Sequence, residues 1–255
     1  DDAYFRLAEV TSIDAESNTL HSTIGDLTYD HLVIATGSKT NYFGNDSIEK
    51  NGMGMKTIPQ ALNIRSLILQ NLEKATITSN KEEREALLNF VIAGAGPTGV
   101  ELSGAIAEVR NNIVPKDYID IKASEIKIHL LEGLDRVLPP MSEKASAKAK
   151  KFLEDLGVQI HLDTMVEEYD GVVVKTNKND NLRSKTFIWS AGVTGAPVKG
   201  LNASALVDKA NRYTVNTFNQ IEGYDNIFAI GDIALMQSEK YPKGHPMVTQ
   251  PAIQQ

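Results

Sequence analysis

The 255-residue sequence contains no cysteine and no run of apolar residues long enough to span a bilayer. Without cysteine, the chain can form neither a disulfide framework nor a thiol redox pair. Lys and Arg number 26 against 33 Asp and Glu, and the net charge of −7 argues against nucleic acid or an anionic membrane surface as a direct partner. The histidines occur singly, without the spacing of a metal-binding motif, so no metal site is expected. They are His21, His31, His129, His161 and His245.

What the sequence does contain is a glycine-rich stretch, Asn89–Glu108, with the letters NFVIAGAGPTGVELSGAIAE. The apolar run Phe90–Ala93 predicts a buried parallel strand, and the apolar periodicity after the glycines predicts a helix. Gly94 permits a sharp turn, Gly96 lets the backbone approach a pyrophosphate, and Gly99 lets the helix pack against the strand. The helix N-terminus offers unpaired N–H groups and a positive dipole end, so a dinucleotide is the expected ligand.

A second indication of a dinucleotide site is an acidic residue at the end of the next strand. The run Ile126–Leu131 predicts that strand, and Glu132 follows it directly. A carboxylate there accepts hydrogen bonds from an adenosine ribose and repels a 2′-phosphate, which favours NADH over NADPH. The spacing from the glycines is longer than usual because Asn111–Glu125 intervenes. The alternative, a solvated loop carboxylate before Gly133, stays open at this point.

The rest of the chain alternates short strands with helices. Strands or small meanders are expected at Tyr4–Thr23, Leu32–Ala35, Val158–Leu162, Val166–Tyr169, Val172–Lys175 and Lys185–Ser190. The strands at Leu32–Ala35 and Lys185–Ser190 are expected to be buried. Helices are expected at Ile58–Lys74, Gly99–Arg110 and Ser142–Leu156. Asn41–Lys56 is rich in Gly and Asn and is expected to be a linker. One βαβ-type module therefore runs from about Ile58 to Ser190, and the flanking sequences must form a second unit together.

A second glycine motif, with the letters NIFAIGD, occupies Asn226–Asp232. Its apolar run predicts a strand that ends at Gly231 and opens into a helix over Ile233–Gln237. Asp232 can accept hydrogen bonds from a polyol while the helix N-terminus faces a phosphate. It can equally be an N-cap that satisfies its own helix. The residues alone leave both interpretations open.

Several motifs together resemble a known family. LTYDHLVIATGS, AGAGPTGVELSGAIAE, IHLLE, IWSAGV and NIFAIGD occur in the order and spacing of flavoprotein oxidoreductases with two dinucleotide-binding domains. With Trp189 and the closing HPMVTQPAIQQ, the chain resembles the type II NADH:quinone dehydrogenases. The resemblance implies an α/β fold in which a Rossmann-like NADH-binding domain, residues 58–190, is inserted in a partial FAD-binding domain with small antiparallel meanders. That partial domain would comprise residues 1–57 and 191–255.

The resemblance also implies which residues form the sites. Thr36 and Gly37 would lie at the flavin side of the FAD domain, and Asp232, next to Gly231, would bind the ribityl chain. NADH would be held by Gly94, Gly96, Gly99 and Glu132, with further cofactor contacts at Pro97, Thr98 and Gly192. Glu101 would lie near the nicotinamide, and Gln250 and Gln254 would lie beside the isoalloxazine ring where quinone docks. As alternatives, Glu101 only complements the helix dipole and the glutamines are only polar helix-start residues.

The function that the resemblance implies is flavin-dependent NADH:quinone oxidoreduction, in which a hydride passes from NADH to FAD and two electrons pass to a respiratory quinone. The intact protein is expected at the cytoplasmic face of a membrane, bound peripherally through a C-terminal region beyond Gln255. The chain is expected to be a soluble fragment, inactive alone, whose FAD domain begins upstream of Asp1. An NADH-dependent reductase of a small iron–sulfur protein and a non-catalytic NADH-responsive binding module remain alternatives, and a homodimer stays open.

Overall fold

The computed structural model describes residues 3–202, 205–207, 210–247 and 252–253. The chain forms two compact units. The first comprises Asp1–Lys39 together with Val193–Gln255, and the second comprises Thr40–Gly192. Within the described ranges, no helix combines the length and apolar character that crossing a bilayer requires.

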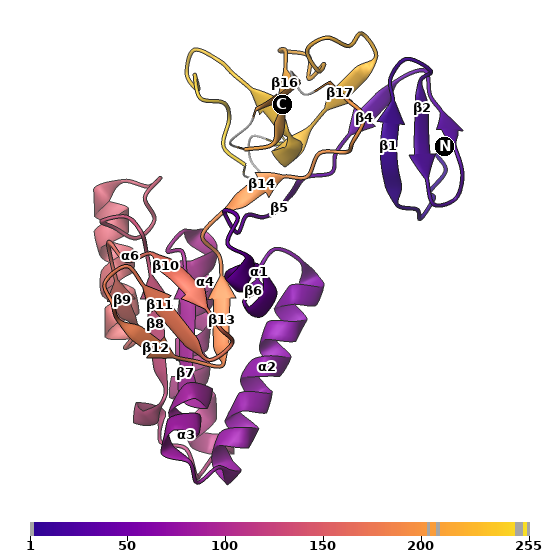
Figure 1. Ribbon diagram of the computed structural model, residues 1–255. Coiled ribbons are helices and arrows are strands. Elements are labelled where there is room, and N and C mark those ends of the chain that lie inside the picture. Colours follow the sequence, from indigo (N-terminus) through magenta and orange to yellow (C-terminus); the bar gives the residue numbers. More distant parts are fainter. Residues whose placement is uncertain (1–2, 203–204, 208–209, 248–251, 254–255) are drawn as a thin grey trace. The chain divides into compact units, whose positions relative to one another are not determined.

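The second unit is built on a five-stranded parallel sheet with the order β6-β13-β7-β8-β9 (Figure 1). The strands are β6 (Met53–Gly54), β7 (Asn89–Ala93), β8 (Lys127–Leu131), β9 (Gln159–His161) and β13 (Thr186–Trp189). Every neighbouring pair is parallel, so all the carboxyl ends lie at one edge. The strands expected at Phe90–Ala93, Ile126–Leu131 and Lys185–Ser190 are confirmed, and their continuous apolar character reflects burial on both faces.

Alternation along the strands divides the interior of this unit into two cores. Phe90, Ile92 and Ile128 point to one face, where the helices cover them. Val91 and Phe187 point to the other face, which a three-stranded antiparallel sheet covers. That small sheet consists of β10 (Val166–Tyr169), β11 (Val173–Thr176) and β12 (Asn181–Arg183). The unit therefore has three layers, which can be followed in Figure 1.

Several helices of the second unit begin at side-chain caps. Thr57 and Gln60 form a capping box at the start of α2, Asn80 caps α3, and Ser142 caps α6. The helical segments are α1 (Asp46–Asn51), α2 (Ile58–Ile77), α3 (Lys81–Leu88), α4 (Pro97–Glu108), the π-helix η1 (Val109–Ile113), α5 (Val114–Asp117), the 3₁₀-helix η2 (Ala123–Glu125) and α6 (Glu143–Asp155). The three helices expected from apolar periodicity are confirmed within a few residues at each end.

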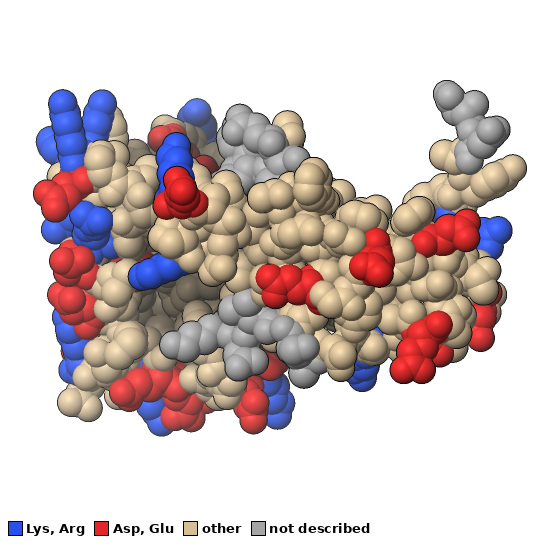
Figure 2. Space-filling view, turned by 90° about the horizontal axis from the view of Figure 1, so that it is seen from above, with Lys and Arg blue, Asp and Glu red and all other residues tan. Residues whose placement is uncertain are grey.

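Surface charges on this unit are mixed rather than grouped by sign. On α6, Lys150 pairs with Glu154 and Lys151 pairs with Asp155, each four residues apart. Lys and Arg side chains lie next to Asp and Glu side chains on the face drawn in Figure 2. The lysines of α6 therefore belong to a solvated helix face.

The expectation of a linker at Asn41–Lys56 is wrong. The segment contains α1 and β6, and Ile48 on α1 is fully buried against the second core. Asn45 caps α1 by accepting a hydrogen bond from the Ile48 N–H. Glycines and asparagines that suggested a linker serve here as helix caps and turns, which explains the error. Residues 40–57 thus lie in the same compact unit as residues 58–190.

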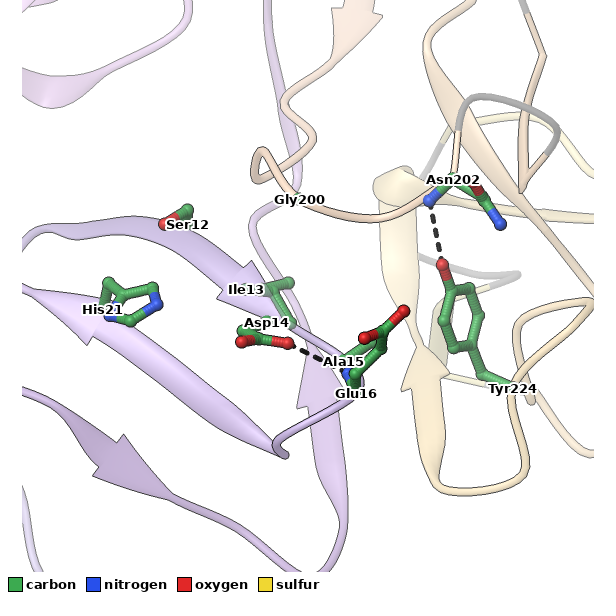
Figure 3. Close-up of a pocket in the computed structure, with 9 residues that line it drawn as sticks. All are labelled: Ser12, Ile13, Asp14, Ala15, Glu16, His21, Gly200, Asn202 and Tyr224. Atoms are coloured by element: carbon green, nitrogen blue, oxygen red, sulfur yellow. Dashed lines mark hydrogen bonds between the residues drawn. The ribbon is translucent and has the colours of Figure 1, made fainter.

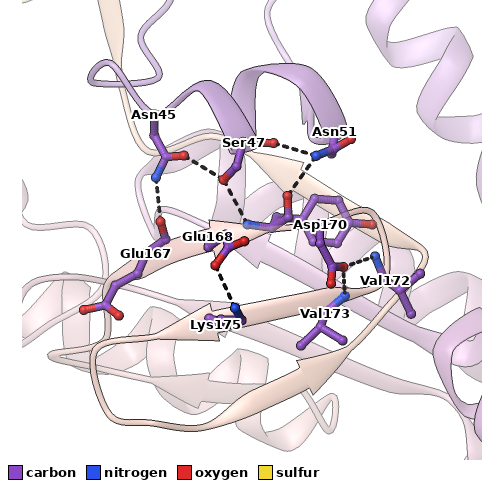
Figure 4. Close-up of polar contacts among 10 residues, drawn as sticks. Asn45, Ser47, Asn51, Glu167, Glu168, Asp170, Val172, Val173 and Lys175 are labelled. Carbon is purple, nitrogen blue, oxygen red and sulfur yellow. Dashed lines mark hydrogen bonds and ion pairs between the residues drawn. The ribbon is translucent and has the colours of Figure 1, made fainter.

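Helix α1 closes the outer edge of β10 with polar side chains (Figure 4). Asn45 Nδ2 donates to the Glu167 carbonyl at 2.8 Å, and Asn51 Nδ2 donates to the Tyr169 carbonyl at 3.0 Å. The Tyr169 N–H donates to Ser47 Oγ at 3.2 Å. These groups take the place of a fourth strand, because they satisfy backbone atoms that β11 does not reach.

The first unit consists of short strands in small sheets. They are β1 (Val10–Asp14), β2 (Thr19–Ser22), β3 (Leu27–Thr28), β4 (Leu32–Ile34), β5 (Ser38–Thr40), β14 (Val193–Gly195), β15 (Leu206–Val207), β16 (Arg212–Val215), β17 (Ile227–Ala229) and β18 (Ala234–Met236). They form β1-β2-β3, β4-β17, β14-β5 and β15-β16-β18. The β4-β17 pair is parallel, and its buried side chains join one apolar core. With both units, the expected α/β fold class with small antiparallel sheets is confirmed.

Three expectations for this unit need correction. The first strand starts at Val10, and the large apolar residues before it are 87–90% exposed: Tyr4, Phe5 and Leu7. Val33 on β4 is 55% exposed, because β4 pairs with β17 alone among the described strands and its outer face is uncovered. Ile233–Gln237 is not a helix, since a single 3₁₀ turn, η4 (Gly231–Ile233), leads directly into β18.

Candidate functional site

In the turn between β7 and α4, contacts within the chain require glycine at two positions, Gly94 and Gly99. Gly94 has a φ of +99°, and a Cβ on it would lie 2.5 Å from the Ala191 Cα. A Cβ on Gly99 would lie 1.8 Å from the Gly94 carbonyl oxygen. Any side chain at these two positions would force the strand, the turn or the helix apart, so both glycines are required by the fold.

Gly96 is different, because no contact among the described residues requires it to be glycine. Its φ of −71° suits any residue, and a Cβ there would meet no atom of the described residues within 4 Å. The space beside Gly96 is therefore open at the carboxyl edge of the sheet. A glycine with ordinary backbone angles beside open space fits a place where another molecule approaches the main chain.

Helix α4 presents its N-terminus at the same place. Gly96 is its N-cap residue and supplies no side-chain cap, and Pro97 occupies the first turn. Thr98 is exposed beside them. The first-turn N–H groups and the positive end of the helix dipole are thus directed at the open space, which is an arrangement that attracts phosphate.

Glu132 follows β8, the neighbour of β7, and its carboxylate reaches the glycine turn. Oε2 accepts a hydrogen bond from the Ala95 N–H at 2.7 Å, and Oε1 accepts one from the Leu134 N–H at 3.0 Å. The side chain is half-buried and held in place, so it is more than a solvated loop carboxylate. Each carboxylate oxygen keeps a second lone pair, which can accept a hydrogen bond from a ligand hydroxyl.

The carboxyl end of β13 lies on the other side of β7 and forms the third part of this edge. Ser190 Oγ donates to the carbonyls of Ala93 and Gly94 at 2.9 and 3.0 Å, which fixes the β13 end against the glycine turn. Gly192 follows it, and a Cβ on Gly192 would lie 2.9 Å from Cζ of Phe43. The edge therefore runs from Glu132 through the glycine turn to Gly192.

A second group of expected residues lies in the first unit, at the carboxyl ends of the parallel strands β4 and β17. Thr36 and Gly37 follow β4, and Gly231 and Asp232 follow β17. Gly37 and Gly231 have φ values of +65° and +73°, and a Cβ on either would meet no atom within 4 Å in the part of the chain that the structure describes. Asp232 lies inside the short turn η4, so it is not the N-cap of a longer helix.

Two residues beside Asp232 have no recognisable sequence signal. Ser38 Oγ donates to Asp232 Oδ2 at 2.6 Å. Arg212 is 8% exposed, and its Nη1 donates to the His245 carbonyl at 2.8 Å. Burial lowers the pKa of Arg212, and the nearby Asp232 carboxylate opposes that shift. Asp232 is thus an acceptor with a fixed orientation beside a buried cation.

Of the three residues expected to be catalytic, the structure describes one. Glu101 lies on the exposed side of α4, one turn after its start. Gln250 and Gln254 lie outside the described residues. Their roles remain predictions.

A hollow of about 450 Å³ in the first unit contains none of the expected site residues (Figure 3). It is lined by β1, β2 and the loop around Gly200, with Asp14 and Glu16 at its rim. The Asp14 carboxylate accepts hydrogen bonds from the Glu16 and Ser17 N–H groups, and bonds to Ser17 lower its pKa. The hydrogen bonds of the Asp14 carboxylate therefore stabilise the turn that follows β1.

His129 and His161 form a pair that the sequence analysis missed. They lie on the adjacent strands β8 and β9, and His129 Nδ1 lies 3.0 Å from His161 Nε2. Burial, followed by the His161 and Lys127 charges, lowers the pKa of His129 to about 4. Burial also lowers the pKa of His161. Their common face on parallel strands was the available signal, but it depended on knowing that β8 and β9 pair.

Comparison with known proteins shows the family. Residues 2–255 match the family described as pyridine nucleotide-disulphide oxidoreductase. The chain belongs to this family. The chain is 36% identical over 97% of its length to a type II NADH:quinone oxidoreductase of Mycobacterium tuberculosis, of which it covers 54%. It is 30% identical over 96% of its length to a probable NADH dehydrogenase of Dictyostelium discoideum, of which it covers 56%.

The chain also has the fold of several solved structures. The chain superimposes on NDH2 of Plasmodium falciparum in complex with NADH with a TM-score of 0.82 and 28% identity, covering 90% of this chain and 50% of the other. It matches a ferredoxin reductase of Rhodopseudomonas palustris with a TM-score of 0.72 at 21% identity, which shows a shared fold. The chain thus spans about half the length of the relatives it matches.

Proposed function

We propose that this chain forms the NADH-binding domain and part of the FAD-binding domain of a flavin-dependent NADH:quinone oxidoreductase. The observation that carries the proposal is the contrast among the three glycines. Gly94 and Gly99 are required by contacts within the chain, whereas Gly96 has ordinary backbone angles beside open space. A dinucleotide pyrophosphate at the α4 N-terminus explains that contrast.

The carboxyl edge of the five-stranded sheet fits NADH. Gly94, Gly96, Pro97, Thr98 and Gly99 would hold the pyrophosphate. The remaining lone pairs of Glu132 would accept hydrogen bonds from the adenosine ribose. A 2′-phosphate there would be repelled by the carboxylate, so the proposal specifies NADH rather than NADPH.

The first unit fits part of an FAD site. Thr36, Gly37, Gly231 and Asp232 lie at the carboxyl ends of two adjacent parallel strands, which is where dinucleotides bind in open α/β sheets. The oriented Asp232 carboxylate suits a hydroxyl of the ribityl chain. Bound FAD would supply the hydride and electron transfer, while the chain supplies position and electrostatics.

For the intact protein, the proposal assigns quinone as the electron acceptor, as in the names of the relatives. Glu101 would orient the nicotinamide carboxamide, and Gln250 with Gln254 would donate to a quinone carbonyl and accept from the flavin edge. The second unit, Thr40–Gly192, would bind NADH, and the first unit, Asp1–Lys39 with Val193–Gln255, would bind FAD. The enzyme would lie peripherally at the cytoplasmic face of a membrane, bound through a region outside this chain, and an association of two copies is compatible with it.

The NADH site can be tested on this chain directly by titration calorimetry. Gly96→Ala places a methyl group where the pyrophosphate approaches, so NADH affinity should fall at least tenfold, or about 1.4 kcal/mol. The matched control is Gly104→Ala on the same helix, where the nearest atom to the new Cβ, in Leu153, is 3.9 Å away. Equal NADH affinity in the Gly96→Ala variant and the parent chain would contradict the proposal.

The reaction requires the full-length, FAD-loaded enzyme. NADH oxidation with a soluble quinone as acceptor should be fast, and it should fall in the Glu101→Ala and Gln250→Ala variants. Turnover with a small iron–sulfur protein in place of quinone would favour the ferredoxin-reductase alternative, whose fold this chain shares. Tight NADH binding without turnover would favour a binding module.

A further inference from the structure

Phe43, in the loop between β5 and α1, has an unusual backbone conformation. Most non-glycine residues with positive φ in the described chain are Asn or Asp, whose short polar side chains tolerate it. The two large apolar ones among the described residues are Leu138, at 50°, and Phe43, at 52°. Leu138 is 7% exposed, so packing accounts for its conformation. Phe43 is 67% exposed, so burial of its ring does not.

The loop holds Phe43 in this conformation through Asn41. The Phe43 N–H donates to Asn41 Oδ1 at 2.9 Å. Asn41 is itself fixed to the end of β13, because its N–H donates to the Gly192 carbonyl at 3.0 Å and its carbonyl accepts from Trp189 Nε1 at 2.7 Å. The Phe43 ring meets the Trp189 ring edge-on, with centroids 6.4 Å apart. A strained, exposed aromatic ring is thus oriented by a specific set of bonds.

The ring stands at the candidate dinucleotide site. Its Cζ lies over Gly192, and Ala191, next in the chain, touches the glycine turn at Gly94. From these contacts and the 3.8 Å spacing of consecutive Cα atoms, Phe43 Cζ is at most about 12 Å from the Gly94 Cα. A nicotinamide riboside attached to the pyrophosphate spans a comparable distance.

The sheet order gives the direction in which that half of the ligand must lie. Glu132, at the end of β8, marks the adenosine side of the glycine turn. In the order β6-β13-β7-β8-β9, β13 lies on the other side of β7. A dinucleotide with its pyrophosphate at the β7 turn and its adenosine toward β8 therefore directs its second half toward β13 and Phe43.

We propose that the exposed ring of Phe43 is an apolar contact for the nicotinamide half of NADH and distinguishes the whole dinucleotide from its ADP-ribose part. The inference rests on the proposed function, because it takes the NADH site as given. The ring covers one side of the nicotinamide riboside and excludes water from it. The backbone strain at Phe43 is kept because this function needs an aromatic ring at that point, directed away from the core.

The test compares two ligands on this chain by titration calorimetry. NADH carries the nicotinamide ring, and ADP-ribose has the same pyrophosphate and both riboses without that ring. Phe43→Ala should weaken NADH binding about fivefold to tenfold and leave ADP-ribose binding unchanged. Phe43→Tyr keeps the ring and should keep both affinities. Phe218→Ala is the matched control, because Phe218 is 79% exposed and lies in the other unit.

A second substitution separates the ring from the backbone. Phe43→Gly removes the same ring as Phe43→Ala and also removes the Cβ that makes positive φ costly. The Gly variant should melt about 2 °C above the Ala variant, while both bind NADH equally weakly. This result would show that the NADH affinity depends on the aromatic ring and that the stability depends on the backbone conformation at position 43.

The other outcomes each decide a separate point. Unchanged NADH affinity in Phe43→Ala, or an equal loss for NADH and ADP-ribose, would overturn the inference and leave the proposed function standing. Failure of the parent chain to bind either ligand would overturn the proposed function itself and the inference with it.

Discussion

The buried histidine of β8 should make the stability of the protein depend on pH. His129 is 4% exposed, and burial is the main cause that lowers its pKa from 6.5 to about 4. Between these values the unfolded chain binds a proton that the folded chain does not, so the free energy of unfolding falls as the pH falls from 6.5 towards 4. The two pKa values give a loss of about 2 kcal/mol between pH 8 and pH 5.

Urea unfolding of the chain at pH 8, 6.5 and 5 measures this loss, and two variants isolate its source. His129→Gln removes the titrating group, so its stability should fall by about 2 kcal/mol less than that of the parent chain over this range. His31→Gln is the matched control for the substitution, because His31 is exposed and lies in the other unit. If the parent chain and His129→Gln lose the same free energy between pH 8 and pH 5, the reasoning is refuted.

Two further predictions concern the fold. Gly99→Ala should destabilise the protein by about 3 kcal/mol or more, because its Cβ would overlap the Gly94 carbonyl, and a melting temperature equal to that of the parent would contradict this. Asn45→Ala should cost about 2 kcal/mol in urea unfolding, because it loses the α1 cap and the bond to the Glu167 carbonyl. A loss below 0.5 kcal/mol would show that α1 does not depend on these bonds.

The parts of the fold that the sequence could predict are those governed by short-range patterns. Continuous apolar runs identified β7, β8 and β13, because strands buried on both faces admit few polar residues. Apolar periodicity identified α2 and α6 for the same local reason. The strand–turn–helix at Gly94–Gly99 was predictable because Gly94 and Gly99 each answer a steric need of neighbouring residues.

The parts that escaped prediction depend on partners distant in the sequence. Helix α1 has only six residues, and its stability comes from contacts with β10, more than 110 residues later. Nothing near Phe43 indicates an exposed ring, since its position follows from bonds between Asn41 and the end of β13. The His129–His161 pair likewise arises from strand pairing. Patterns within a short stretch of sequence do not indicate which distant residues that stretch contacts in the folded chain.

The amide side chains that α1 presents to β10 also bear on self-association. A strand at the edge of a sheet normally offers a row of unpaired N–H and C=O groups that a second chain can extend. Here Asn45, Ser47 and Asn51 already occupy three of the backbone groups on that edge. Because these groups are already hydrogen-bonded, a strand of a second molecule cannot pair with the outer edge of β10. The six-residue helix therefore protects the small sheet against aggregation through this edge.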